Sequence, residues 1–301
     1  MNELEKDKNK QEPEVYDVEI IEPKQDPKEV AEVKEKGPEK QFPSWQDLLS
    51  TVGVFGLSVM VASFFVASMM KTRGVATPTP DMTFIYYIIQ MLPTLVFVMW
   101  LRHRAGRENA VHWGHRDVNF PTLLWGFVLI AASGIVLEPV LSLFPTEGYD
   151  NVTNTIGTGG WAILSTVIAA PVLEEMLFRG LIFETCRERF GNMWAVLISA
   201  LLFGLIHIVP VQMVNAFVVG VILGYIYLKT RSLLSVIILH ATNNVIAYLN
   251  ITLFGESADV TVQSLFTSKI AYWILYAIAL GIFVYSFVNL WKTLHTDSKN
   301  S

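Results

Sequence analysis

The sequence predicts an all-α polytopic membrane protein, a bundle of about eight transmembrane helices with both termini in the cytoplasm. Of its 301 residues, 52% are hydrophobic and 16% are charged, and the mean hydropathy is +0.43. Residues 1–50 hold 8 Lys and 14 Asp or Glu, a net charge of −6, whereas residues 51–301 hold 14 Lys or Arg and 13 Asp or Glu, a net charge of +1. So little charge in so long a body is typical of a chain that crosses a bilayer repeatedly.

Residues 1–45 are expected to form a disordered cytoplasmic arm rich in acidic residues and lysine. Apolar residues are isolated there and have no periodic face, so the segment cannot bury enough surface to offset the entropy lost on ordering. We expect any partner of this arm to be cytoplasmic. No nucleic-acid partner is expected, because no stretch of the chain has a clustered Lys/Arg face.

Eight apolar runs account for the predicted helices. A helix needs about 20 apolar residues to cross a hydrocarbon core of about 30 Å. Such runs fall near residues 51–70, 82–101, 120–144, 161–183, 193–209, 211–228, 233–254 and 270–291. They define one transmembrane domain at residues 46–292, which is followed by a short cytoplasmic tail at residues 293–301.

The residues between the runs indicate the orientation. Basic residues follow the first two runs, Pro145 follows the third, Pro210 separates the fifth from the sixth, and Lys292 closes the last. When alternate loops are assigned to opposite sides, one side receives 13 Lys or Arg residues and the other receives three. Because cytoplasmic loops carry the excess of Lys and Arg, both termini are expected in the cytoplasm of a multi-pass cell-membrane protein.

Few polar residues fall inside the runs, and helix geometry sorts them. An ionisable group inside a span costs about 2.5 kcal/mol or more and marks function by default. Glu175 and Arg179 lie at i and i+4 on one face of the fourth helix, which is the spacing of an ion pair, whereas Glu174 is rotated by about 100°. His207 lies in the fifth helix, and His240 and Asn244 share a face of the seventh. Each of these could be a structural contact, but together they need partners in a medium without water.

Convergence of these residues would assemble the parts of a hydrolytic site. A carboxylate such as Glu174 can take a proton from water, and His207 could hold that water or protonate a leaving amine. His240 and Asn244 could donate hydrogen bonds to the oxyanion of a tetrahedral intermediate. No serine, threonine or cysteine belongs to the set, so a covalent mechanism is not favoured.

These residues resemble a known family. Glu174-Glu175-x-x-x-Arg179, Phe203-x-x-x-His207 and His240-x-x-x-Asn244 occur in that order, as in the CPBP intramembrane proteases, which include the type II CAAX prenyl endopeptidases and the abortive-infection or bacteriocin-immunity proteins. The similarity covers roughly residues 120–254. It implies that Glu174 is the catalytic base, that Glu175 and Arg179 support it, that His207 shares the water and that His240 with Asn244 stabilises the oxyanion.

A metal site is the alternative reading of the same residues. Glu174, His207 and His240 are two histidines and one carboxylate, a set that could hold a divalent ion such as zinc, and the similar family is often described as metalloproteases. There is no His-Glu-x-x-His motif, however, and a metal bound by Glu174 would leave the reaction without an assigned base. We therefore favour a metal-free mechanism without a cofactor.

The depth of the site follows from helix lengths. At about 1.5 Å per residue, His240 lies about 10 Å from the cytoplasmic end of its helix, whereas His207 lies about 20 Å from the end of its own. The two histidines meet only if the hairpin between the fourth and fifth helices projects beyond the membrane. The cavity is then expected in the cytoplasmic half of the bilayer.

The sequence thus predicts an intramembrane endopeptidase that hydrolyses a peptide bond with a glutamate-activated water. Its substrate would be a peptide or membrane-protein segment, prenylated or not, as in CAAX-type or bacteriocin-precursor processing. Two alternatives remain: a non-catalytic membrane immunity or scaffold protein, and a proton-coupled transporter. A transporter would be expected to show an inverted repeat, and the two halves of the chain show no convincing match.

Overall fold

The structure of the chain is a computed structural model that describes residues 42–107, 113–114, 117–146, 148–254 and 262–296. Residues 1–41 of the predicted disordered arm (residues 1–45) lie outside the described residues. Residues 297–301 of the predicted tail lie outside them as well. The described part of the tail, residues 293–296, belongs to the last helix. Residues Gln41–Ser301 form one compact unit, and its described residues form helices and no strands.

Seven helices of the described chain are long and apolar enough to cross a membrane, and the protein is therefore a multi-pass membrane protein. They are α1 (Trp45–Arg73), α2 (Pro80–Arg104), α3 (Phe120–Leu141), a composite helix (Gly160–Phe190), α9 (Pro210–Thr230), α10 (Leu233–Phe254) and α11 (Lys269–Thr296). The fifth predicted helix is present as α8 (Asn192–Leu205), but its 14 residues reach only about 21 Å. The short elements α4 (Tyr149–Ile156) and η5 (Gln263–Leu265) lie in connections.

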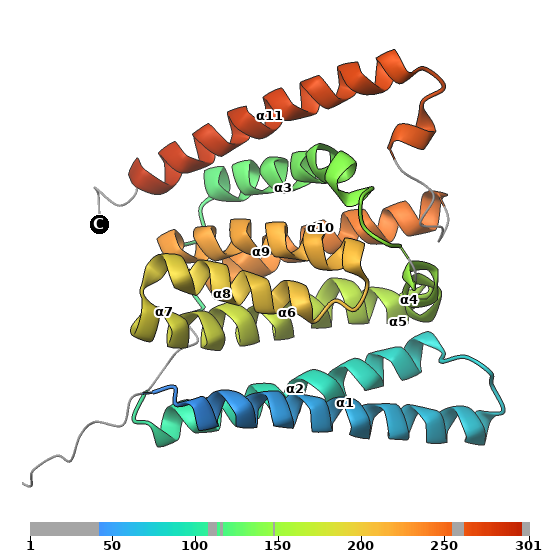
Figure 1. Ribbon diagram of the computed structural model, residues 1–301, viewed down its shortest axis with the longest axis vertical. Helices are drawn as coiled ribbons and strands as arrows, with labels where there is room; N and C mark the ends of the chain where they lie inside the picture. Colours follow the sequence, from blue (N-terminus) through green and yellow to red (C-terminus); the bar gives the residue numbers. More distant parts are fainter. Residues whose placement is uncertain (1–41, 108–112, 115–116, 147, 255–261, 297–301) are drawn as a thin grey trace, which may run out of the picture. The chain divides into compact units, whose positions relative to one another are not determined.

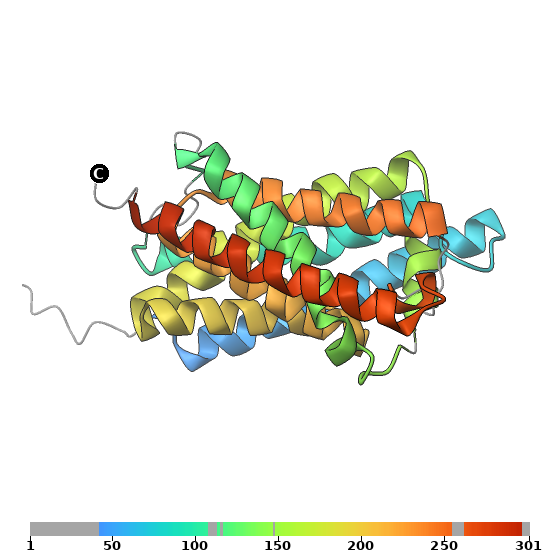
Figure 2. The same cartoon turned by 90° about the horizontal axis from the view of Figure 1, so that it is seen from above.

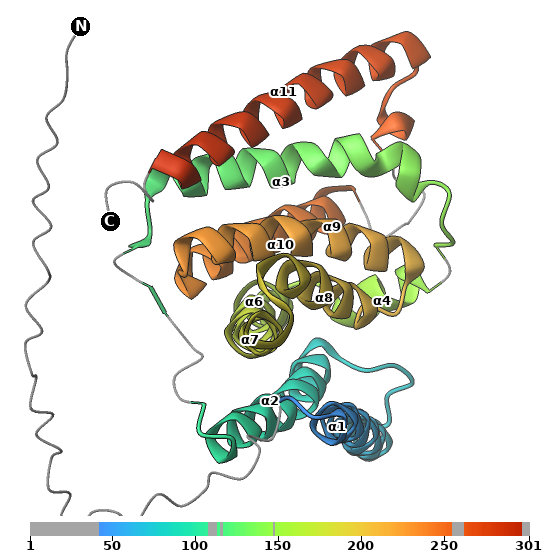
Figure 3. The ribbon, with the colours of Figure 1, turned by 60° about the vertical axis from the view of Figure 1, so that its left-hand side comes forward.

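The helices pack in pairs. The hairpin of α1 and α2 lies beside the composite helix, and α8 packs along α9 (Figure 1). Figures 1 and 2 both show α11 running beside α3. Figure 3 shows α9 and α10 between the pair α3–α11 and the composite helix. The inner positions of α6, α9 and α10 are therefore shielded from lipid by neighbouring helices.

The composite helix is longer than its apolar run. It consists of α5 (Gly160–Ala162), the π-helical segment η3 (Ile163–Ala169), α6 (Ala170–Glu175), the π-helical segment η4 (Met176–Phe183) and α7 (Glu184–Phe190). Its 31 residues reach about 46 Å, well beyond a 30 Å core, and it ends at Gly191, which has a φ of 86°. The composite helix is therefore longer than a membrane crossing needs, and the projection of its hairpin beyond the membrane stays a prediction. π-Helical turns are rare and often occur at functional sites.

Contacts between charged and polar side chains lie near both ends of the described chain. Asp47 of α1 lies 3.6 Å from Arg104 of α2, and Arg102 pairs with Glu188 of α7 at 3.1 Å. Lys229 at the end of α9 lies 3.3 Å from His295 of α11. Both described ends therefore lie at the α7 end of the bundle. The assignment of that end to the cytoplasm stays a prediction from the Lys and Arg count.

Close packing of α8 against α9 depends on small residues. A Cβ on Gly220 would lie 3.2 Å from Ala200, and one on Gly204 would lie only 2.8 Å from the backbone oxygen of Met213. Backbone cannot move aside as a flexible side chain can, so Gly204 permits the approach of the two helices. This contact fixes the end of α8, and with it the position of His207.

We expect Gly204→Ala to lower the free energy of unfolding by about 1–3 kcal/mol, because the added methyl group overpacks this contact. The matched control is Gly281→Ala in α11, where nothing lies within 4 Å of the new Cβ. That change should be neutral or slightly stabilising. Thermal unfolding of both variants in one detergent measures the difference, and equal melting temperatures would contradict the role of Gly204.

Candidate active site

The six residues expected from the sequence to form the site occur on three elements that meet inside the bundle. Glu175 of α6 is fully buried, and its Oε1 accepts a hydrogen bond from Nη1 of Arg179 at 2.9 Å. Arg179 is also fully buried, and its Nη2 donates to the carbonyl oxygen of Gly220 on α9 at 3.1 Å. The structure thus contains the i,i+4 ion pair, and that pair joins the composite helix to α9.

His240 of α10 lies between the two glutamates. Its Nδ1 is 2.8 Å from Oε1 of Glu175, and its Nε2 is 3.6 Å from Oε2 of Glu174. A carboxylate only accepts hydrogen bonds, so Nδ1 carries a proton. A lone pair on Nε2 would be repelled by an ionised Glu174, which favours one proton held between the two groups. At 3.6 Å they are not yet hydrogen-bonded, and such contacts often tighten when substrate binds.

Glu174 has a partner that the sequence did not indicate. The hydroxyl of Tyr87 on α2 donates to Oε1 of Glu174 at 2.8 Å. Tyr87 lies outside the three motifs, and its one sequence signal is a hydroxyl in the middle of an apolar run, since a buried tyrosine hydroxyl usually finds a partner. Glu174 is therefore held on Oε1 by Tyr87, while its Oε2 faces His240.

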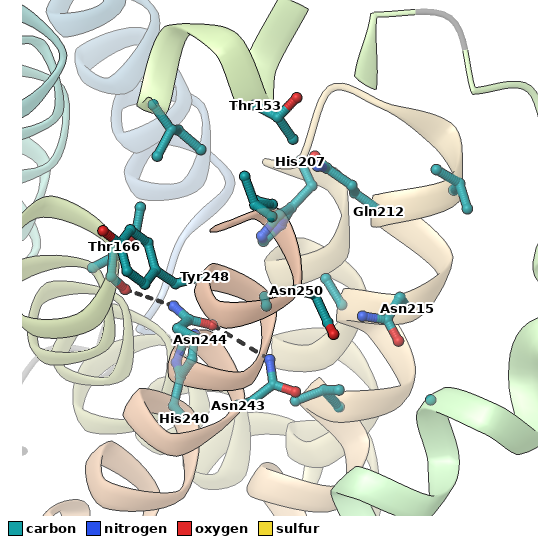
Figure 4. A pocket seen from close by; sticks show the side chains of 18 of the residues that line it. Thr153, Thr166, His207, Gln212, Asn215, His240, Asn243, Asn244, Tyr248 and Asn250 are labelled. Carbon is teal, nitrogen blue, oxygen red and sulfur yellow. Dashed lines mark hydrogen bonds between the residues drawn. The ribbon is translucent and has the colours of Figure 1, made fainter. Parts of the chain in front are cut away.

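His207 is positioned by the end of α8. Because the helix ends at Leu205, the carbonyl of Phe203 lacks its helical partner, and the backbone amide of His207 donates instead to Gly204 at 3.0 Å. The ring Nδ1 of His207 bonds to the free Phe203 carbonyl at 2.9 Å. Since that carbonyl accepts, Nδ1 is protonated, and Nε2 is left as the basic nitrogen. Figure 4 shows the ring in the space between the helices.

The ring of Phe203 separates and orients the charged groups. The rings of His207 and His240 lie edge-on to it, with centroids at 5.2 Å and 5.5 Å, and the guanidinium of Arg179 lies 4.7 Å from its centroid. An arginine over an aromatic face is attracted by the ring quadrupole. Phe203 thus brings both histidines to one place without a direct contact between them.

Asn244 is held by the backbone of the composite helix. Its Nδ2 donates to the carbonyl of Thr166 in η3 at 2.8 Å, and its Oδ1 accepts from Asn243 at 3.3 Å (Figure 4). The π-helical turn therefore receives a side-chain donor from α10. Because an amide nitrogen has two protons, one N–H of Asn244 stays available for a substrate oxygen.

These groups line a cavity of about 640 Å³, a size typical of ligand sites. Glu174, His207, His240 and Asn244 form part of its wall. The wall continues along α10 as far as Ile251 and along α3 to Ser142. At about 1.5 Å per residue, the stretch of α10 from His240 to Ile251 is about 16 Å long. The sequence predicts the cavity in the cytoplasmic half of the bilayer, which is the α7 end of the bundle. In the structure the cavity instead runs from His240 toward the opposite end.

The alternative metal set is only partly assembled. Among the described residues, no three His, Cys, Asp or Glu side chains converge closely enough to hold a metal ion. His240 has one ring nitrogen on Glu175 and the other facing Glu174, and one nitrogen of His207 is used by the Phe203 carbonyl. Glu174, His207 and His240 therefore do not fit a metal centre in this arrangement, and no step of the proposed reaction is derived through one.

Comparison with known proteins agrees with the motifs. Residues 157–246 match the family model described as type II CAAX prenyl endopeptidase Rce1-like, and this range contains all six candidate site residues. The Bacillus subtilis (strain 168) protein named "Putative membrane peptidase YdiL" is 23% identical over 168 residues, which cover 53% of this chain and 68% of that protein. No solved structure matches. The resemblance to the CPBP intramembrane proteases, inferred from three short motifs, is confirmed.

Proposed function

We propose that this chain, whose residues 157–246 match the type II CAAX prenyl endopeptidase family, hydrolyses a peptide bond within the cell membrane with a water activated by Glu174. The observation that carries the proposal is the arrangement of Glu174 on the cavity wall, held by Tyr87 at 2.8 Å and facing His240 at 3.6 Å. A positioned carboxylate beside a proton carrier is the core of general acid–base catalysis.

In this mechanism, Glu174 takes one proton from a water held between it and Nε2 of His207. The water oxygen attacks the carbonyl carbon, and the carbonyl π electrons move to the oxygen, which accepts a hydrogen bond from the remaining N–H of Asn244. When the tetrahedral intermediate collapses, the C–N bond breaks and the leaving nitrogen takes the proton from Glu174. This transfer returns Glu174 to its carboxylate form, and His240, fixed by Glu175, shares a proton with Glu174 between turnovers.

This assignment gives His240 a role different from the one that the resemblance implied. Both of its ring nitrogens face carboxylates, so its geometry supports a proton carrier better than an oxyanion donor. The donor role is left to Asn244, whose side chain is fixed by Thr166.

The test is a comparison of peptides in membranes from cells that carry the wild-type chain or Glu174→Gln. Peptide fragments that need the wild-type chain should disappear in the variant. Identical peptide sets would remove the support for a peptidase. An immunity phenotype that survives the substitution would instead favour a scaffold.

We expect cleavage without a metal. Purified protein should contain no stoichiometric zinc, and cleavage should persist in excess chelator, because Glu174 cannot both bind a metal and act as the base. Elemental analysis and a chelator titration measure the two quantities. Stoichiometric zinc together with chelator-sensitive cleavage would overturn the metal-free mechanism.

We expect Tyr87→Phe to lower kcat by about 10-fold to 100-fold, the effect of removing one hydrogen bond to a charged group, and to leave KM nearly unchanged. Tyr87 is a positioning residue, because it contacts Glu174 and acts through it. Tyr86→Phe, on the adjacent position, is the matched control. A change in KM alone would assign Tyr87 to substrate binding instead.

A further inference from the structure

The cavity wall beyond Glu174 is rich in carboxamide side chains. Gln212 and Asn215 of α9 and Asn243 and Asn250 of α10 line it, and Figure 4 shows them around the space between the two helices. Within the described residues, Gln212, Asn215 and Asn250 have no hydrogen-bond partner. A carboxamide both donates and accepts, as a peptide group does, so these side chains suit the backbone of a bound polypeptide.

The cavity wall has no Lys or Arg among its described residues. Its Asp and Glu side chains are Glu138 and Glu174, and its histidines, His207 and His240, already face the Phe203 carbonyl and the two glutamates. Arg179 is fully buried and already bonded to Glu175 and Gly220. A carboxylate brought into this space would lose its water without gaining a cation, which is costly.

The length of the cavity bears on which part of a polypeptide fits. It follows α10 for about 16 Å from His240 to Ile251. An extended chain rises about 3.3 Å per residue, so about five residues fit on this side of the reacting centre. Asn243 and Asn250 are two helical turns apart on one face of α10, a separation of about 10 Å that matches three residues of extended chain.

We propose that the cavity binds an internal, extended and uncharged stretch of polypeptide through these carboxamides, and not a chain end that carries a free carboxylate. This proposal rests on the proposed peptidase function and specifies its substrate. An enzyme that cleaves at a fixed short distance from a C-terminal carboxylate would need a cation to bind that carboxylate. This cavity has carboxamides in its wall and no Lys or Arg among its described residues.

The experiment uses purified full-length Glu174→Gln protein in detergent, which should bind substrate without cleaving it. The probe is a pool of randomised decapeptides in matched forms, with a C-terminal amide or a free carboxylate, and with or without one central Asp. Mass spectrometry of the retained peptides should show equal retention of the amide and carboxylate forms. A central Asp should reduce retention at least tenfold.

Variants locate the binding. Asn215→Ala and Asn243→Ala should each weaken retention by about fivefold to tenfold, the effect of one lost hydrogen bond. The control Asn289→Ala, on α11 and away from the cavity wall, should leave it unchanged. Preferential retention of the free carboxylate form, tolerance of Asp, unchanged retention in both variants or no retention at all would overturn the proposal.

The outcome is separable from that of the proposed function. If fragments disappear from Glu174→Gln membranes but the decapeptides are not retained, the peptidase stands and this account of its substrate fails. If the decapeptides are retained as expected but no fragments depend on Glu174, the cavity binds polypeptide without hydrolysing it.

Discussion

Glu174→Gln is expected to lower kcat for peptide cleavage by about 10²-fold to 10⁴-fold, the contribution typical of a general base. Glutamine has the same shape, and its amide oxygen can still accept the hydrogen bond from Tyr87. What is lost is the ability to take a proton from water. The measurement is single-turnover cleavage in proteoliposomes, with the melting temperature of each preparation recorded beside it.

The matched control is Glu188→Gln. Glu188 is also a glutamate of the composite helix in contact with an arginine, Arg102, but it lies at the α7 end of the bundle and does not line the cavity. Its substitution should leave cleavage unchanged. Equal loss in both variants would mean that charge anywhere on this helix, and not the base, controls activity.

Much of the site could be predicted because intramembrane charge is scarce. Glu175 and Arg179 stood out by their i,i+4 spacing on an apolar helix, and the structure contains their ion pair at 2.9 Å. The lengths of the apolar runs also predicted where the long helices lie. These are local properties of the chain, and a sequence displays them directly.

The rest depends on contacts that no local pattern encodes. Tyr87 reaches Glu174 across 87 positions of sequence, through the packing of α2 on the composite helix. The π-helical turns around α6 also left no sign, because they rotate side chains without changing composition. A similar reason explains why α8 is shorter than the predicted fifth helix at residues 193–209. The apolar residues continue to Val209, but the helix ends at Leu205, and the free carbonyl of Phe203 bonds to the ring of His207.

The second large effect is on stability. Arg179→Met is expected to lower the free energy of unfolding by about 3–5 kcal/mol, because it leaves the carboxylate of Glu175 buried without its cation. Both side chains have no exposed surface, and Oε2 of Glu175 already has no hydrogen-bond partner among the described residues. Water therefore cannot replace the lost guanidinium without opening the core of the bundle.

The double variant Glu175→Met/Arg179→Met separates charge from packing. Removing both members of a buried pair in favour of apolar residues is often neutral, so much of the lost stability should return. Activity should not return, because His240 would lose the acceptor that fixes its Nδ1. Reversible unfolding in mixed micelles gives the free energies, and the non-additivity of the two single variants gives the coupling.

Arg73→Met provides the comparison at the surface. Its pair with Asp81 has a similar N–O distance, 2.7 Å, but the Arg73 side chain is 47% exposed. Water screens such a pair, so the expected loss is below about 1 kcal/mol. If Arg179→Met cost no more than Arg73→Met, Glu175 would have to be neutral in the folded protein. In that case Glu175 could also carry the proton that His240 shares with Glu174. Glu175 would then take part in proton transfer and would not only hold the His240 ring in place.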